Sequence, residues 1–140
     1  MYRIGFVHVF RIPEDEELLA YVNKFAKTKG IKAGVVLAIG SLKNCKLGYY
    51  DRIAQRYEVF EVNEDVELIS ALGNISLREG EPFAHIHVAI GKRDGSTVSG
   101  HLIEGRVFVA EVVIIELEGP ELVRKREGGL WLWKPGLNME

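Results

Sequence analysis

Apolar and polar residues alternate along most of this chain, which predicts a protein built mainly from β-strands. Successive side chains of a strand point to opposite faces, so a period of two indicates a strand with one buried face. Alternating or continuously apolar segments cover residues 2–10, 33–39, 42–50, 56–62, 83–90, 97–103, 106–117 and 122–126. Residues 130–133 predict one more short strand, whose two tryptophans should pack onto the domain or a neighbouring subunit.

Residues 66–77 allow two interpretations. A short helix could begin after a cap at Asn63. The alternation of Leu68, Ser70 and Leu72 and the turn-forming Gly73 favour a strand instead. We therefore expect a strand here.

A helical pattern is clear only between residues 13 and 30. Pro13 suits a first helical turn, and the four acidic residues 14–17 suit the positive end of a helix dipole. Gly30 is a typical residue at which a helix ends. An apolar stripe at helical spacing consists of Leu18, Leu19, Val22, Phe25 and Ala26. The pattern predicts one long helix that begins at Pro13.

The 140 residues are 47% hydrophobic and 27% charged, which is typical of a globular chain. There is no internal repeat, linker or low-complexity segment, so we expect a single domain spanning residues 1–140. The elements together predict an α+β fold. Its sheet should be mostly antiparallel and strongly bent or barrel-like, with one long covering helix.

Charge and cysteine content exclude several classes of protein. The formal net charge of −2 is unlike that of a dedicated nucleic-acid binder, and the basic run 124–126 predicts a solvated strand edge. The single cysteine, Cys45, excludes an intrachain disulfide and a cysteine-based zinc cluster. The N-terminal segment lacks the apolar core of a signal peptide, and no apolar run is long enough to span a membrane. We expect a soluble, cytoplasmic protein.

Three of the four histidines lie in one short stretch. His85 and His87 stand two residues apart in a predicted strand, so both rings should lie on the same face. His101 follows a turn-rich segment long enough to return the chain as a hairpin. Three neutral imidazoles with one open position are typical of a catalytic zinc site. Alternatively, these residues are ordinary polar positions on a sheet face.

One carboxylate, Glu111, interrupts the apolar run 107–115. Burying a carboxylate is costly unless it is paired, hydrogen-bonded or close to a metal ion. Glu111 could therefore be a fourth ligand, a residue that orients a histidine, or a general base. It could equally be structural, at a subunit contact and paired with an arginine such as Arg56 or Arg106.

Five segments resemble the PPC domain family, whose name stands for "plants and prokaryotes conserved". They are LAIGSLKNCKLGYYD (37–51), RYEVFEV (56–62), ELISALGNISL (67–77), FAHIHVAIGKRDGSTVSGHL (83–102) and AEVVIIEL (110–117). The resemblance implies a homotrimer, because stand-alone prokaryotic members look like homotrimers. It also implies distant kinship with acetolactate decarboxylase and a zinc-dependent ester hydrolase, which hold zinc with an HxH pair and a third, later histidine.

Carried over residue by residue, the resemblance implies that His85, His87 and His101 are metal ligands and that Glu111 is the nearest match to a catalytic carboxylate. Plant members carry an AT-hook that holds DNA. This chain lacks the Arg-Gly-Arg-Pro core of that motif, so the plant mechanism of DNA binding does not transfer.

We therefore expect a homotrimeric binding module rather than an enzyme. Its histidine-lined site should hold zinc or another divalent metal, or a small-molecule ligand. The family also suggests DNA-associated regulation, but direct DNA binding should be weak and without sequence preference. The alternative is a metal-dependent lyase or hydrolase acting on a small molecule, with Glu111 moving a proton.

Overall fold

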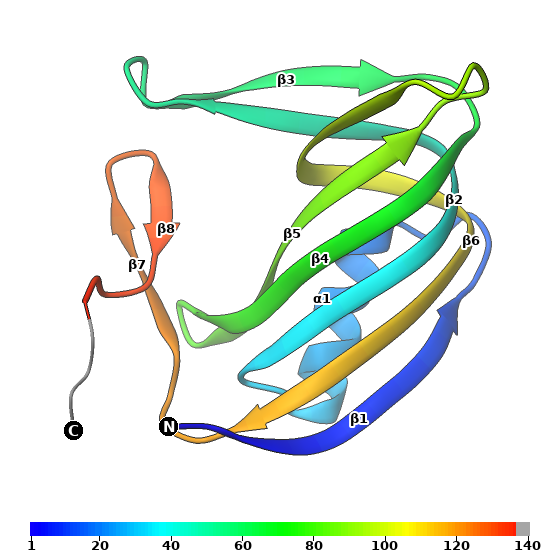
Figure 1. Cartoon of the computed structure of the whole chain (residues 1–140). Helices are drawn as coiled ribbons and strands as arrows, with labels where there is room; N and C mark the ends of the chain where they lie inside the picture. The colour runs from blue at the N-terminus through cyan, green and yellow to red at the C-terminus, as the bar shows by residue number, and fades with distance from the viewer. Residues whose placement is uncertain (137–140) are drawn as a thin grey trace.

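The computed structural model describes residues 1–136 as one helix and eight strands (Figure 1). The helix is α1 (Leu18–Lys29). The strands are β1 (Arg3–Ile12), β2 (Gly34–Asp51), β3 (Arg56–Val62), β4 (Val66–Arg78), β5 (Glu81–Gly91), β6 (Thr97–Glu118), β7 (Val123–Glu127) and β8 (Leu130–Leu132). The segment that allowed a helix or a strand is thus strand β4.

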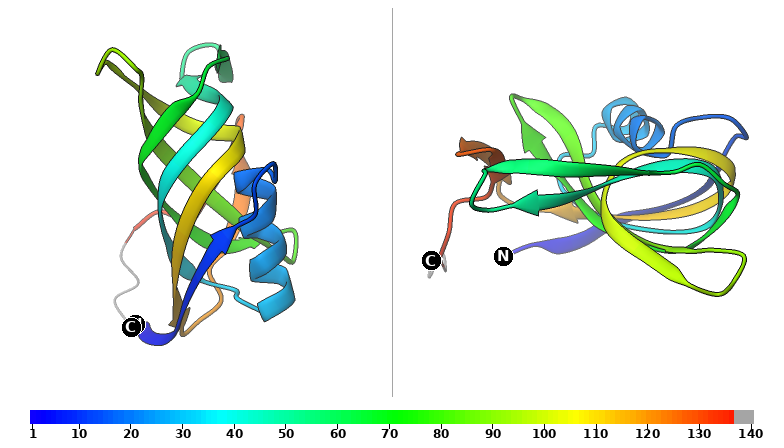
Figure 2. Two further views of the ribbon diagram at one scale, coloured as in Figure 1. Left: turned by 90° about the vertical axis from the view of Figure 1, so that its right-hand side faces the viewer. Right: turned by 90° about the horizontal axis from the view of Figure 1, so that it is seen from above.

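The strands pair in the order β3-β2-β6-β5-β4-β7-β8, and β1 pairs with β6. All of these pairs are antiparallel except β4 with β7. The 22-residue strand β6 is long enough to pair with β5 near its start and with β1 near its end, while β2 lies beside it throughout. An additional pairing of β2 with β4 draws the middle of the sheet into a strong curve, visible from above in Figure 2.

Two parts of the predicted fold class are wrong. The protein is mostly sheet, 66% strand, with a single short helix of 12 residues rather than one long covering helix. The sheet is also not a barrel. In the described residues β1, β3 and β8 each pair with only one other strand, so the sheet keeps free edges.

The helix is short because the acidic segment before it pairs with β6. The Asp15 N–H donates to the Val107 carbonyl (2.8 Å), and the Val107 N–H donates to the Glu16 carbonyl (2.9 Å). These bonds hold residues 14–16 in a turn, with Asp15 at a φ of 70°, which a continuous helix could not follow. Glu17 then caps the helix, since its carboxylate accepts hydrogen bonds from the N–H groups of Leu19 and Ala20.

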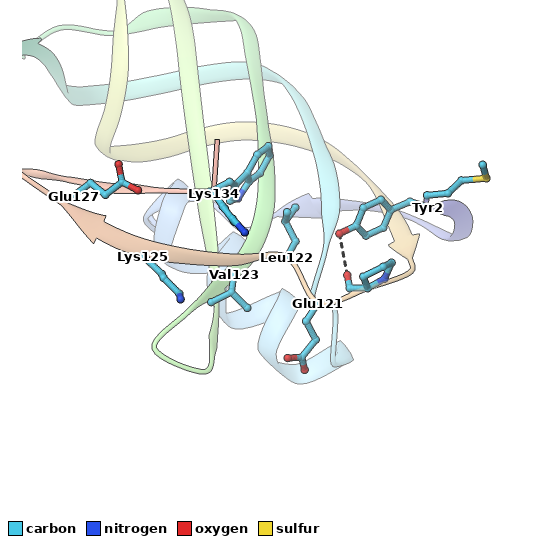
Figure 3. Close-up of a pocket in the computed structure, with 10 residues that line it drawn as sticks. Tyr2, Glu121, Leu122, Val123, Lys125, Glu127 and Lys134 are labelled. Atoms are coloured by element: carbon cyan, nitrogen blue, oxygen red, sulfur yellow. Dashed lines mark hydrogen bonds between the residues drawn. The ribbon is translucent and has the colours of Figure 1, made fainter. Parts of the chain in front are cut away.

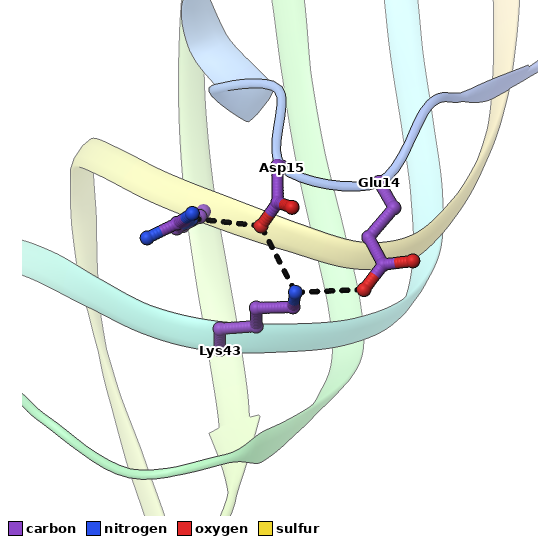
Figure 4. Close-up of polar contacts among 4 residues, drawn as sticks. Glu14, Asp15 and Lys43 are labelled. Atoms are coloured by element: carbon purple, nitrogen blue, oxygen red, sulfur yellow. Dashed lines mark hydrogen bonds and ion pairs between the residues drawn. The ribbon is translucent and has the colours of Figure 1, made fainter.

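The acidic residues also have distant partners, which Figure 4 shows in detail. The Lys43 Nζ atom lies 2.7 Å from a carboxylate oxygen of Glu14 and 2.9 Å from one of Asp15. Asp15 also accepts a hydrogen bond from Arg106 Nε on β6 (2.9 Å). The charges that suggested a helix start therefore fix the connection between β1 and α1 onto the sheet.

The core lies between α1 and one face of the sheet, and Figure 2 shows the helix lying along that side. Leu18, Val22 and Ala26 of the helix are fully buried. Inward-facing side chains of β2, β4, β5 and β6 complete one continuous apolar cluster. Within residues 1–136, no helix has the length and apolar character needed to cross a bilayer.

Gly73 on β4 permits the close pairing with β5 that positions the candidate site. A methyl group at Gly73 would collide with the main-chain oxygen of His85.

We predict that Gly73→Ala lowers the free energy of unfolding by about 1–3 kcal/mol, because backbone must move to admit the methyl group. At Gly5, also in a strand, a methyl group would meet only the flexible Glu118 side chain. Gly5→Ala is the control and should change stability by less than about 1 kcal/mol in urea unfolding.

Candidate metal centre

Side chains of strand β5 alternate between the core and the candidate site. Ala84, Ile86 and Val88 are buried in the core, at 2%, 1% and 4% exposure. His85 and His87 lie on the opposite face, as the alternation predicted. The inward methyl groups fix the register of the strand, so the two imidazole rings must share the outer face.

His101 reaches the same place from β6. The turn between β5 and β6 closes with a hydrogen bond from the Lys92 N–H to the Ser96 carbonyl, and Asp94 accepts hydrogen bonds from the N–H and hydroxyl of Ser96. The returning strand then places His101 directly opposite His87. Directly opposed residues of neighbouring strands lie on the same face.

The structure brings all three histidines together. One nitrogen from each ring can be chosen so that all three lie within 4.8 Å of one another. The Nε2 atoms of His85 and His87 are 3.1 Å apart. Two nitrogens bound tetrahedrally to one Zn²⁺ ion at about 2.0–2.1 Å would lie about 3.3 Å apart, so this spacing suits a shared ion. Nδ1 of His101 is buried and has no hydrogen-bond partner in the described part of the chain.

The surroundings keep the rings of His85 and His101 neutral. Burial lowers the pKa of His85 to about 4, with smaller contributions from the positive charge of Arg124 and from His101 and His87. Burial, and to a lesser degree His87, likewise lowers the pKa of His101 to about 4. Neutral imidazole nitrogens are the form that binds a metal ion. The donor set and its electrostatics therefore fit a divalent cation.

The three histidines line a cavity of about 480 Å³. On one side Tyr57 of β3 stacks against His101, with ring centroids 4.7 Å apart. The opposite wall comes from the C-terminal hairpin of β7 and β8, which includes Arg124 and Trp131. The tryptophans thus pack onto the body of the domain, and the Trp133 indole N–H donates to the Ser76 hydroxyl (3.1 Å).

Sequence reasoning missed Arg124. We expected the basic run 124–126 to be a solvated edge, and the two residues after Arg124 are indeed exposed. Arg124 itself is only 5% exposed and donates to the Ser76 hydroxyl (2.8 Å). Two of its three acceptors, Asn74 and Ser76, lie 50 and 48 residues away in the sequence, so no local pattern could reveal its burial. The nearest signal was the pair of tryptophans that follows closely in the chain.

Glu111 is not a member of the histidine cluster. It is exposed on β6, opposite Arg11 of β1 and Ile39 of β2 in the strand register. It lines an open hollow of about 540 Å³ whose other walls are largely apolar. Arg106, one of its expected partners, pairs with Asp15 instead.

A different cavity, of about 750 Å³, lies between the N-terminus and the start of β7 (Figure 3). Tyr2 closes one side of it by donating to the Pro120 carbonyl (2.9 Å). Its charged wall residues are Glu121, Lys125, Glu127 and Lys134, two of each sign, so it has no dominant charge. None of the site residues predicted from the sequence lines it, and the histidine cavity remains the stronger candidate.

Comparisons with known proteins bear on this arrangement. The sequence model of the Plants and Prokaryotes Conserved (PCC) domain matches residues 1–118. A bifunctional protein GlmU of Synechococcus sp. (strain JA-3-3Ab) is 29% identical over 113 residues. That match covers 79% of this chain but only 17% of the relative, so it concerns a small part of that protein.

Three solved structures share the fold across nearly the whole chain. A plant- and prokaryote-conserved (PPC) protein of Pyrococcus horikoshii is 44% identical with a TM-score of 0.95, covering 98% of this chain and 96% of that one. A metal-containing protein of Archaeoglobus fulgidus is 34% identical with a TM-score of 0.90, covering 96% and 97%. A candidate DNA-binding protein of Bacteroides thetaiotaomicron, 24% identical with a TM-score of 0.85 and coverage of 96% and 97%, shows the fold alone.

The lowered pKa values of His85 and His101 predict how the stability of the metal-free protein depends on pH. Both rings take up protons near pH 4 in the folded protein and near pH 6.5 in the unfolded chain. The unfolded state therefore binds more protons between these values, and the free energy of unfolding falls as pH falls from 6.5 towards 4. A double variant, His85→Asn with His101→Asn, should show a smaller decline in urea unfolding measured with a chelator present. Equal declines would contradict the assignment.

Proposed function

The chain belongs to the Plants and Prokaryotes Conserved domain family, and on that premise we propose that it is a metal-binding module. His85, His87 and His101 hold the ion, which is zinc or another divalent metal. Three imidazole nitrogens suit zinc and the later first-row metals rather than magnesium or calcium, which prefer oxygen ligands.

The observation that carries this proposal is the unpartnered His101 Nδ1 beside two other histidines. A buried polar atom without a partner is costly, and an ion bound through this nitrogen would remove that cost. The similarity to the metal-containing protein of Archaeoglobus fulgidus supports the same conclusion.

Three protein ligands would leave one coordination position of a four-coordinate ion open. A metal there supplies Lewis acidity and can activate a bound water, so a lyase or hydrolase acting on a small molecule is the alternative function. That alternative needs a group to move the proton. Glu111 is exposed and outside the cluster, which favours a binding role over catalysis.

Metal content tests the proposal directly. Protein purified without a histidine tag and incubated with Zn²⁺ should retain one ion per chain after gel filtration, measured by elemental analysis. His87→Asn should reduce the occupancy to below about one tenth, because two histidines alone hold the ion weakly. His8→Asn is the matched control, since His8 lies on β1 beside Glu116 and outside the cluster. Equal metal content in the two variants would refute the site.

We also propose that the protein assembles as a homotrimer through the face of the sheet opposite α1. Apolar side chains of β1, β2 and β4 are exposed there: Val9 is 75% exposed, Ile39 56% and Leu72 58%. Register places these strands side by side with β6 between β1 and β2, so the residues form one continuous face. An exposed apolar face of this extent marks an interaction surface, and the family resemblance supports a second and third copy as its partners.

Ile39→Lys should therefore weaken assembly by about 100-fold or more, because a lysine would be buried without a partner. Light scattering across a dilution series measures this, with Ile53→Lys as control. Ile53 is 84% exposed in the turn between β2 and β3, away from the face. The Glu111→Gln variant should still bind the metal ion at the three histidines. Only the stability or the assembly of the protein should change. A wild-type chain that scatters as a monomer at micromolar concentration would exclude the trimer.

Association with DNA is proposed only as weak and independent of sequence. Structures named as candidate DNA-binding proteins share the fold at 24% and 19% identity. The net charge of −2 offers little counterion release on binding.

A further inference from the structure

The buried guanidinium of Arg124 has no acidic partner in the part of the chain that the structure describes. Its Nε donates to the Ser76 hydroxyl (2.8 Å), one Nη to the Trp131 carbonyl (3.0 Å) and the other to the Asn74 side-chain oxygen (2.6 Å). All three acceptors are neutral. A guanidinium carries five N–H groups, so each terminal nitrogen retains one without a partner.

A buried cation of this kind is costly without an anion. Arginine stays protonated even where burial lowers its pKa, as it does here. The neutral acceptors and the Trp133 ring, whose centroid lies 4.9 Å from the guanidinium carbon, hold the group in place but supply no compensating anion. Three guanidinium groups in the described chain do have a carboxylate partner, and all three lie nearer the surface. They belong to Arg3, Arg78 and Arg106, whose side chains are 84%, 35% and 54% exposed.

The guanidinium also lies beside the proposed metal ligands. Asn74, which accepts its hydrogen bond, stands directly opposite His85 in the pairing of β4 with β5. Arg124 and the three histidines line the same cavity of about 480 Å³. A ligand in that cavity can therefore contact the guanidinium and the open metal position together.

The remaining walls are largely aromatic and apolar, and include Leu130 and Leu132 of the C-terminal hairpin. Tyr57, Phe83 and Trp131 line the cavity, and a second guanidinium, Arg78, lies 4.4 Å from the Trp131 ring at the partly exposed rim. Aromatic walls favour a planar or apolar group, and an arginine fork favours a carboxylate or phosphate. A cavity of this size admits a small molecule rather than a polymer.

We propose that this cavity binds a small organic carboxylate with a planar apolar body, whose carboxylate group pairs with Arg124 and reaches the metal. The metal contact rests on the proposed function, whereas the Arg124 contact does not. The C-terminal hairpin that carries Arg124 and Trp131 lies beyond residues 1–118, which the family model matches. Arg124 and Trp131 thus lie outside the segment that the family model matches.

Benzoate and benzamide, equal in shape and different in charge, test the proposal as probes. Tryptophan fluorescence and calorimetry should show that the wild-type protein binds benzoate at least about tenfold more tightly than benzamide, with chelator and with Zn²⁺. Equal binding of the two, or no benzoate binding at millimolar concentration, would overturn the proposal. Tighter binding of inorganic phosphate would overturn the carboxylate assignment.

Variants then locate the contact. Arg124→Gln should weaken benzoate binding at least about tenfold, and Arg124→Lys should lose less because it keeps the charge. Lys125→Gln on the same hairpin is the matched control, since Lys125 is exposed. An equal loss of benzoate affinity in this variant would show that the ligand responds to the overall positive charge of the hairpin and not to a contact with Arg124. Circular dichroism checks folding, and the benzoate–benzamide comparison decides the question in wild type if Arg124→Gln unfolds.

Binding that depends on Arg124 in chelated protein and is unchanged by Zn²⁺ would uphold the guanidinium contact while refuting the metal contact. Zinc retention by the three histidines without discrimination between benzoate and benzamide would uphold the metal site and refute the carboxylate. The two failures are therefore distinguishable.

Discussion

The pairing of β5 with β4 and β6 is the constraint on which the rest of the site depends. Alternate side chains of a strand point to opposite faces. Because Ile86 and Val88 are buried in the core, His85 and His87 must lie on the other face of β5. The same register on β6 brings His101 opposite His87. The hydrophobic core thus positions a polar site on the opposite face of the strand.

The site itself is built at a cost to the folded chain. Two rings have pKa values well below their ordinary value, one ring nitrogen has no partner among residues 1–136, and a nearby guanidinium is buried among neutral groups. The unpartnered nitrogen and the buried guanidinium destabilise the metal-free, ligand-free protein, and the lowered pKa values do so as pH falls below 6.5. Such groups commonly mark functional sites, because binding relieves what folding alone leaves unsatisfied.

Local sequence pattern predicted what depends on neighbours along the chain. It identified the β-strands, the shared face of His85 and His87, and histidine as the residue type that forms the candidate metal centre. The helix start was wrong because Asp15 binds Lys43 and Arg106, which are 28 and 91 residues away. Kinship with acetolactate decarboxylase stays a prediction. Arg124 escaped notice for the same physical reason as the helix start, since its burial depends on contacts made far along the chain.

The attachment of the C-terminal hairpin has a thermodynamic consequence. Strand β7 pairs with β4 at only two positions, Leu77 with Val123 and Arg78 with Arg124. A segment held by so few main-chain pairs opens locally at a lower free energy than the sheet. Opening would remove one wall of the cavity and give a small molecule a route in and out. Ligand affinity therefore depends on the equilibrium between the open and closed hairpin. Part of the binding free energy offsets the cost of keeping the hairpin closed.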